Sequence, residues 1–73
     1  MKIGIPREIK DKEYRVAITP SGVQALTSRG HEVIIETNAG VDSTFMNEDY
    51  EEVGAQILAT AQEVFYQADM ILE

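Results

Sequence analysis

The sequence contains no cysteine and no tryptophan, and His31 is its single histidine. Without cysteine there is no disulfide and no thiolate metal cluster, and one histidine is too few for a histidine-rich metal site. No apolar run approaches the ~20 residues of a membrane-spanning helix, and Pro6 interrupts the start before any secretory signal could form. We therefore expect no bound metal, no membrane contact and a cytoplasmic location.

Basic residues are missing from the second part of the chain. All six Lys and Arg lie within residues 1–29, together with three acids, whereas residues 30–73 carry ten acids and no base. The net charge of −7 makes binding to a nucleic-acid backbone unfavourable. The acids of the second part are expected to form a solvated face, while the basic first part can attract a small anion.

The pattern of the chain predicts an α/β fold. Apolar runs typical of strands alternate with capped helical patterns, which indicates a parallel sheet with helical crossovers. We predict a Rossmann-like or flavodoxin-like sheet of about four strands with three helices. The expected strands are 2–5, 31–36, 55–58 and 70–72, and the expected helices are 20–29, 48–53 and 61–67.

Capping residues mark the ends of these helices. Thr19 before Pro20, and Thr60 three residues before a glutamate, are typical helix starts, and Asn47 is the expected cap of the second helix. Gly30 and Gly54 are expected just past helix ends, where a positive φ is needed. The aromatic residues Phe45, Tyr50, Phe65 and Tyr66 are expected in the core or at an interface.

The first twenty residues combine a strand, a charged connection and a helix start. The strand ends at Pro6, which has no amide hydrogen to continue a ladder, and residues 7–15 carry seven charged side chains. In open α/β sheets, sites form at the carboxyl ends of strands, where this connection begins. The candidate functional residues therefore lie here, and His31 is expected at the other end of the sheet in a surface or hydrogen-bonding role.

The same stretch resembles the amino terminus of the alanine dehydrogenase and nicotinamide nucleotide transhydrogenase family. Smaller matches continue to Gly54-Ala55, so the resemblance covers nearly the whole chain. The two blocks that carry it are Ile3-Gly4-Ile5-Pro6-Arg7-Glu8 and Glu13-Tyr14-Arg15-Val16-Ala17-Ile18-Thr19-Pro20.

This resemblance implies that residues 1–73 are the amino-terminal part of a substrate domain. This chain has no counterpart of the family's lysine-containing substrate-site segment, of the histidine and aspartate that the family uses in catalysis, or of its nucleotide-binding domain. A G-x-G-x-x-G loop is also missing, because the five glycines are widely spaced. The resemblance implies NAD as the cofactor of the parent protein, L-alanine and pyruvate as its substrates, and a homo-oligomer.

By resemblance, Arg15 binds the substrate carboxylate. A guanidinium forms two parallel hydrogen bonds with a carboxylate, which suits an enzyme acting on a small amino or keto acid. Glu13 lies two residues earlier and either orients Arg15 or is simply solvated. Arg7 and Glu8 either line the same cleft or, as we favour, form a structural ion pair.

Three functions are open at this point. We favour a part of an NAD-dependent L-alanine dehydrogenase, because Gly30-His31-Glu32-Val33 and residues 49–55 are more similar to the dehydrogenases. The close alternative is the amino terminus of a transhydrogenase α-subunit. The third is a non-catalytic, small acidic α/β module that binds a partner.

The 73-residue chain alone is predicted to have no dehydrogenase activity, since it carries neither a nucleotide loop nor a catalytic acid or base. Purified chain mixed with L-alanine and NAD at alkaline pH should show no reduced cofactor by absorbance. Sustained turnover would contradict the assignment of the missing parts.

Overall fold

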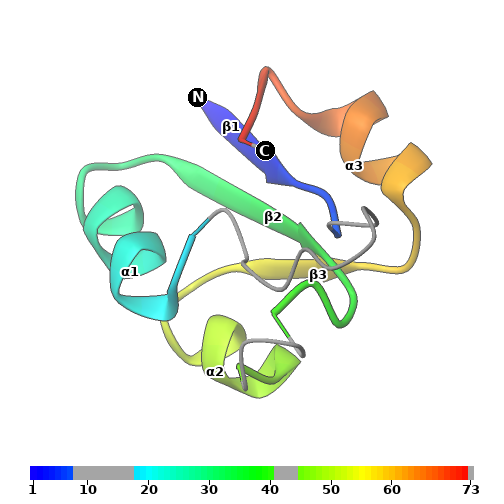
Figure 1. The fold of residues 1–73 in the computed structure, drawn as a ribbon. Helices are drawn as coiled ribbons and strands as arrows, with labels where there is room; N and C mark the ends of the chain where they lie inside the picture. The colour runs from blue at the N-terminus through cyan, green and yellow to red at the C-terminus, as the bar shows by residue number, and fades with distance from the viewer. Residues whose placement is uncertain (8–17, 41–44, 73) are drawn as a thin grey trace.

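The computed structural model describes residues 1–7, 18–40 and 45–72, and it confirms the predicted alternation of strands and helices (Figure 1). The elements begin and end within two residues of the expected positions. In chain order they are β1 (Lys2–Ile5), α1 (Pro20–Ser28), β2 (Glu32–Glu36), α2 (Asn47–Glu52), β3 (Gln56–Leu58), α3 (Ala61–Gln67) and β4 (Met70–Ile71).

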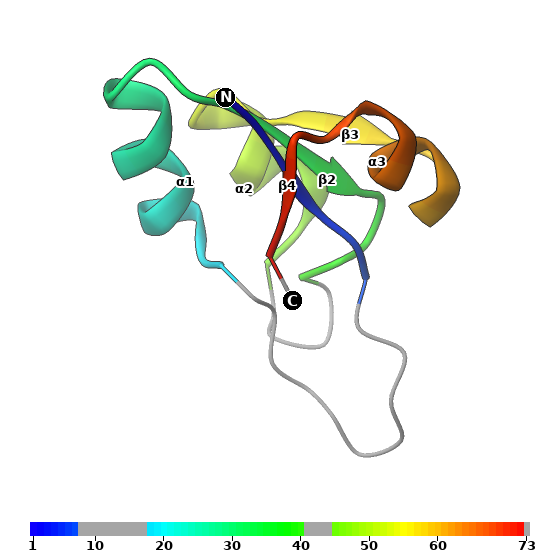
Figure 2. The ribbon, with the colours of Figure 1, turned by 90° about the horizontal axis from the view of Figure 1, so that it is seen from above.

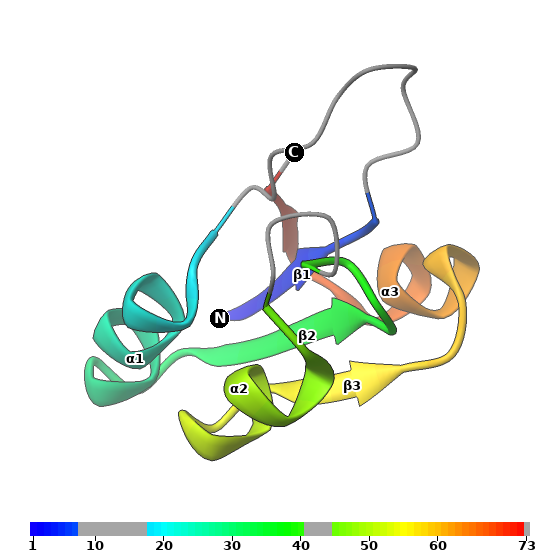
Figure 3. The same ribbon diagram turned by 60° about the horizontal axis from the view of Figure 1, so that its bottom comes forward.

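The four strands form one parallel sheet with the order β3-β2-β1-β4. Ile3 is paired with Val33 of β2 on one side and with Met70 of β4 on the other. The arrowheads of β2 and β3 point the same way in Figure 3, and Figure 2 shows β4 beside β1. The predicted parallel, Rossmann-like sheet is therefore confirmed.

Helices cover both faces of the sheet. The α1 and α2 helices lie on one face and α3 lies on the other (Figure 1). Val23 of α1 and Tyr50 of α2 pack with Ile5, Val33 and Ile35, whereas Val64 of α3 packs with Ile34 and Leu58. Successive strand side chains point to opposite faces, so the run from Val33 to Ile35 supplies both layers.

Most of the expected helix ends are confirmed. The hydroxyl oxygen of Thr19 accepts a hydrogen bond from the Gly22 N–H at 3.3 Å, and that of Thr60 accepts one from the Glu63 N–H at 3.1 Å. Gly30 and Gly54 have φ values of 89° and 100° and follow the C-cap residues of α1 and α2, as expected for residues that leave a helix.

The expected cap of α2 is wrong. Met46 is the N-cap residue, and its N–H donates to a carboxylate oxygen of Asp49 at 2.8 Å. Asn47 is the first helical residue, and its side chain turns back to the loop after β2 instead of capping its own helix. Asp49, the third helical residue, thus supplies the side-chain acceptor at this helix start, and it acts on the N–H of the N-cap residue.

The aromatic residues divide between the core and the surface. Tyr50 is fully buried, and Phe45 packs against it. Phe65 and Tyr66 of α3 are 52% and 92% exposed, so they are not in the core, and their other predicted setting, an interface, stays a prediction. Their helix buries Val64 against the sheet and directs its next two residues outward.

Within the described residues, the helices are too short and too polar for any of them to cross a membrane.

Gly4 allows α3 to lie close to β1. A Cβ placed on Gly4 would be 2.7 Å from the Cβ of Ala68 and 2.8 Å from Cγ1 of Val64. Atoms in a packed interior do not approach to such distances, and the Cβ of Ala68 cannot rotate away. A side chain at residue 4 would therefore push α3 off the sheet.

Replacing Gly4 with alanine should destabilise the protein by ~1–3 kcal/mol, the usual cost of overfilling a packed core. The urea midpoint should fall while the slope of the transition stays unchanged. Lys2→Ala, on the same strand but partly exposed, is the control and should cost less than ~1 kcal/mol. A Gly4→Ala variant as stable as the parent would show that α3 is not held this closely.

Candidate functional site

The strand order places a topological switch point at the carboxyl ends of β1 and β4. The chain proceeds from β1 to β2 and β3 in one direction, and α3 then carries it back to β4 on the other side of β1. Ligands of open α/β sheets bind where the strand order reverses in this way, outside the carboxyl ends of the strands. Pro6 and Arg7 follow β1 directly at this point, and Leu72 follows β4.

A hydrogen bond joins the ends of β1 and β2 at this edge of the sheet. The backbone N–H of Arg7 donates to Oε1 of Glu36, the last residue of β2, at 2.7 Å. A carboxylate acceptor makes such a bond stronger than one between neutral groups. The Arg7 side chain is exposed, and its predicted role, a structural ion pair with Glu8 or a place in the cleft, stays a prediction.

The loop after β2 is fixed by the side chain of Asn47. Its Oδ1 accepts from the N–H of Asn38 at 2.9 Å, and its Nδ2 donates to Oγ1 of Thr37 at 2.9 Å. Asn38 has a φ of 62°, a left-handed conformation that asparagine tolerates better than most residues. The start of α2 is thereby joined to the carboxyl end of β2.

Tyr50 links α2 to Ile18, the residue before Thr19, which caps α1. The Tyr50 hydroxyl donates to the backbone carbonyl of Ile18 at 3.0 Å, and its ring meets that of Phe45 edge to face with centroids 6.2 Å apart. A Cβ on Gly40 would be 2.5 Å from the Tyr50 hydroxyl oxygen. Glycine at residue 40 thus leaves the room that the hydroxyl occupies.

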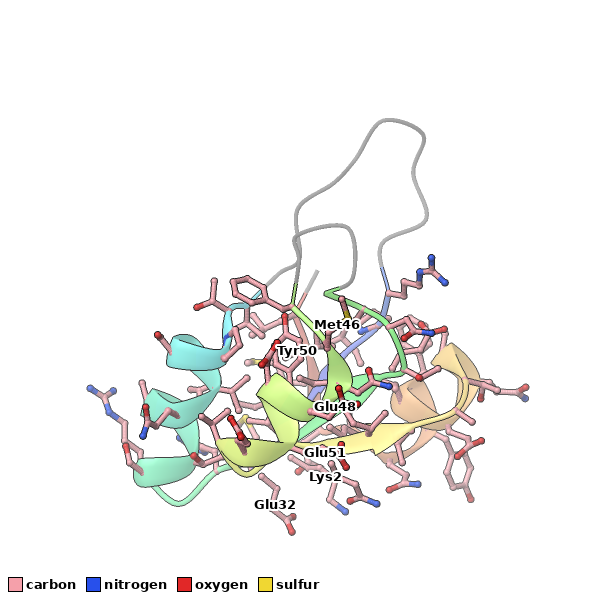
Figure 4. All side chains as sticks on the ribbon, turned by 90° about the horizontal axis from the view of Figure 1, so that it is seen from below. Lys2, Glu32, Met46, Glu48, Tyr50 and Glu51 are labelled. Carbon is pink, nitrogen blue, oxygen red and sulfur yellow. The ribbon has the colours of Figure 1, made fainter. Side chains whose placement is uncertain are left out.

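Burial raises the pKa of Tyr50 above its ordinary value of 10.0, and the negative charge of Asp49 raises it further. Both effects disfavour the phenolate, so the hydroxyl keeps its proton and remains a donor to Ile18. In Figure 4, Tyr50 and Met46 lie toward the end of the molecule opposite Lys2 and Glu32, which begin the first two strands.

The other predicted site residues lie outside the described residues. Arg15, Glu13 and Glu8 all fall within residues 8–17, so their predicted roles stay predictions. Both flanks of this stretch, Arg7 and Ile18, are held by the hydrogen bonds described above. Sequence reasoning missed Glu36 and Tyr50, because their partners are backbone groups distant in the sequence.

The remaining titratable groups indicate no second site in the described part of the chain. His31 lies just before β2, at the opposite end of the sheet from the candidate site, as expected. Among residues 1–7, 18–40 and 45–72, no three His, Asp or Glu side chains are grouped so that they could hold a metal ion.

The fold places the chain in the broad class of parallel, doubly wound α/β domains, with the switch of strand order beside β1. Comparisons with known proteins identify the family within this class. Residues 4–73 match the family model described as "Alanine dehydrogenase/PNT, N-terminal domain". The match covers nearly the whole chain, and the chain therefore belongs to this family. This confirms the resemblance seen in the sequence.

Individual relatives agree with the family match. The chain is 55% identical over its whole length to the alanine dehydrogenase of Methanococcus maripaludis. A solved L-alanine dehydrogenase is similar with a TM-score of 0.95 and 41% identity, and a transhydrogenase from Sinorhizobium meliloti with 0.90 and 33%. The chain covers 20% of each of these three proteins, so it spans about a fifth of their length.

The residues present do not fit a dinucleotide such as NAD. In dinucleotide-binding folds, a glycine-rich turn follows the first strand so that the pyrophosphate can approach the backbone. Here β1 is followed by Pro6 and Arg7, and the next glycine is Gly22, already inside α1. The sequence after β1 therefore lacks the glycine-rich turn of a dinucleotide-binding fold.

Tyr50 predicts a loss of stability at alkaline pH. The folded protein holds the Tyr50 proton more tightly than the unfolded chain, so this stabilisation is complete below pH 10.0 and is lost as the pH rises through the raised pKa. In that window the free energy of unfolding should fall by up to ~1.4 kcal/mol per pH unit from this group.

The Tyr50→Phe variant should show a shallower alkaline decline in urea unfolding measured from pH 8 to 12. Tyr66→Phe is the matched control, since Tyr66 is 92% exposed, and it should keep the slope of the parent. Equal slopes for the parent and Tyr50→Phe would contradict the raised pKa.

Proposed function

We propose that this chain is the amino-terminal part of the substrate domain of an NAD-dependent L-alanine dehydrogenase. That enzyme interconverts L-alanine with pyruvate and ammonia, with NAD as the hydride acceptor. The observation that carries the proposal is the identity of 55% and 52% to two alanine dehydrogenases over the full length of this chain. The switch of strand order between β1 and β4 supports a site at this edge of the sheet.

A transhydrogenase is the second candidate. It is favoured by the similarity to the Sinorhizobium meliloti structure, at 33% identity and a TM-score of 0.90. The solved L-alanine dehydrogenase is more similar by both measures, at 41% and 0.95, and we therefore prefer the dehydrogenase. Oxidation of L-alanine by the full-length protein, assayed with NAD, distinguishes the two.

The role proposed for this chain is to bind the substrate. Arg15 would pair with the carboxylate of L-alanine or pyruvate through two parallel hydrogen bonds and so set the orientation of Cα. Arg7, at the end of β1, and Glu13 and Glu8 near Arg15 in the sequence would support that arginine or line the cleft. NAD would be bound by a part of the parent protein outside this chain, and a homo-oligomeric state and a cytoplasmic location belong to the same proposal.

Arg15→Ala in the full-length enzyme should lower kcat/KM for L-alanine by about thirty-fold to several thousand-fold. A carboxylate left unpaired in a closed cleft costs roughly 2–5 kcal/mol, and ~1.4 kcal/mol corresponds to a factor of ten. Arg15→Lys keeps the charge but loses the paired donors, so it should recover only part of the loss.

Two measurements accompany this test. NAD binding to the Arg15→Ala enzyme should hardly change, and Lys10→Ala should have little effect on activity. Activity of the Arg15→Ala enzyme within about threefold of the parent, a difference below ~1 kcal/mol, would refute the role of Arg15.

A further inference from the structure

The two outer strands of the sheet differ in composition. At one side of the sheet, β3 begins with an exposed polar residue, Gln56. At the other side, β4 and the residue after it read Met70-Ile71-Leu72, without a polar side chain. Continuous apolar runs are typical of parallel strands that lie inside a sheet and are covered on both faces. β4 therefore has the composition of an interior strand in an outer position.

The apolar side chains of β4 serve both layers but are incompletely covered. Leu72 packs with the cluster under α1 and α2, and Ile71 packs with the cluster under α3. Both are only partly buried, and Met70 is 41% exposed. In the neighbouring strand β1, Ile3 and Ile5 are 3% and 0% exposed. The described helices thus leave both faces of β4 partly open.

The backbone of β4 has an open side as well. The Leu72 N–H donates to the Gly4 carbonyl of β1 at 2.9 Å. Successive residues of a strand direct their backbone groups to opposite sides, so the N–H and C=O of Ile71 point away from β1. Within residues 1–7, 18–40 and 45–72, no strand lies on that side. Such an edge is a template for a further strand, and β4 has neither the charge nor the proline that commonly protects one.

The handedness of the fold determines where a further connection would lie. The helices α1 and α2 lead the chain from β1 to β2 and β3 on one face, and α3 leads it back to β4 on the other (Figure 1). Connections between parallel strands are right-handed in nearly all proteins. A connection from β4 to a strand beyond it continues in the direction of the step from β3 to β4. Its helix must therefore lie on the same face as α3.

Phe65 is placed to meet such a helix. Val64 is fully buried against the sheet, and each further residue of an α-helix lies about 100° around the axis. In a right-handed crossover this rotation turns Phe65 to the side of α3 that faces β4, and Tyr66 away from the sheet. Their exposures of 52% and 92% agree with these directions.

We propose that β4 is an interior strand of the complete protein. A parallel strand from the residues that follow residue 73 pairs with its open side, and the helix leading to that strand packs beside α3 on Phe65. This inference rests on the proposed function, in which the chain is part of a longer enzyme. The alanine dehydrogenases that it matches have the length for this, since the chain covers 20% of them. A second copy of the chain could also pair with β4, but only a strand of the same polypeptide also accounts for the position of Phe65.

Hydrogen exchange in the full-length protein, resolved to single amides, tests the pairing. The Ile71 N–H should exchange within about tenfold of the rate of the Leu72 N–H, because both are then bonded inside one sheet. Fast exchange at Ile71 beside slow exchange at Leu72 would leave β4 at the edge and overturn the proposal. Slow exchange at Ile71 that is lost when the protein is diluted to monomers would place a second copy there, which overturns it as well.

Thiol labelling tests the helix contact. Residues 1–73 contain no cysteine, so Phe65→Cys and Tyr66→Cys each introduce one thiol into this part of the full-length protein, made without other reactive thiols. The thiol at position 65 should react at least about tenfold more slowly than the one at position 66, because it lies under the added helix. Equal rates would refute the contact. If Phe65→Cys does not fold, hydrogen exchange at Ile71 decides.

Activity measured on the same preparation separates this inference from the proposed function. A full-length protein that does not oxidise L-alanine but protects Ile71 would refute the function and support the interior position of β4. An active enzyme with an open Ile71 would overturn the interior position and leave the function in place.

Discussion

The two-sided pairing of β1 is the constraint on which the other features depend. This strand of four residues bonds to β2 along one edge and to β4 along the other. The strand order therefore reverses at β1, and its carboxyl end lies at the switch point. Pro6 then ends the ladder and directs the chain out of the sheet. The same strand needs a glycine at its centre, because α3 crosses it too closely for a side chain.

A polar framework lies at the carboxyl ends of the strands. Three side chains, those of Glu36, Asn47 and Tyr50, bond to the backbone N–H of Arg7, the backbone N–H of Asn38 and the carbonyl of Ile18. A backbone group that leaves a sheet or helix loses its regular partner, and these side chains replace it. The carboxyl ends of the strands are thus held by hydrogen bonds, while the helices on the two faces of the sheet are held mainly by apolar packing.

Much of the fold was predictable from the sequence, and the reasons are local. The β-branched run at 33–35, the hydroxyl caps Thr19 and Thr60, and the glycines after α1 and α2 each act within a few residues, so their patterns are visible in the chain itself. The cap of α2 was misjudged because Asn47 and Asp49 can both serve near a helix start, and only the fold shows that Asn47 is engaged by Thr37 and Asn38. Glu36 and Tyr50 were missed for the same reason, since their partners are 29 and 32 residues away. The family motif predicts the role of Arg15, which no spacing rule indicates, and that role stays a prediction.

The contact between Gly40 and Tyr50 has a consequence for how this domain can change over time. The hydroxyl of Tyr50 occupies the place where a side chain at residue 40 would begin, so the two positions share one volume. A related chain with a larger residue at position 40 must have given up the tyrosine at position 50, or have moved the loop that carries residue 40 away from α2. Substitutions at these positions are therefore expected to occur as a pair wherever the loop that carries residue 40 keeps its place beside α2.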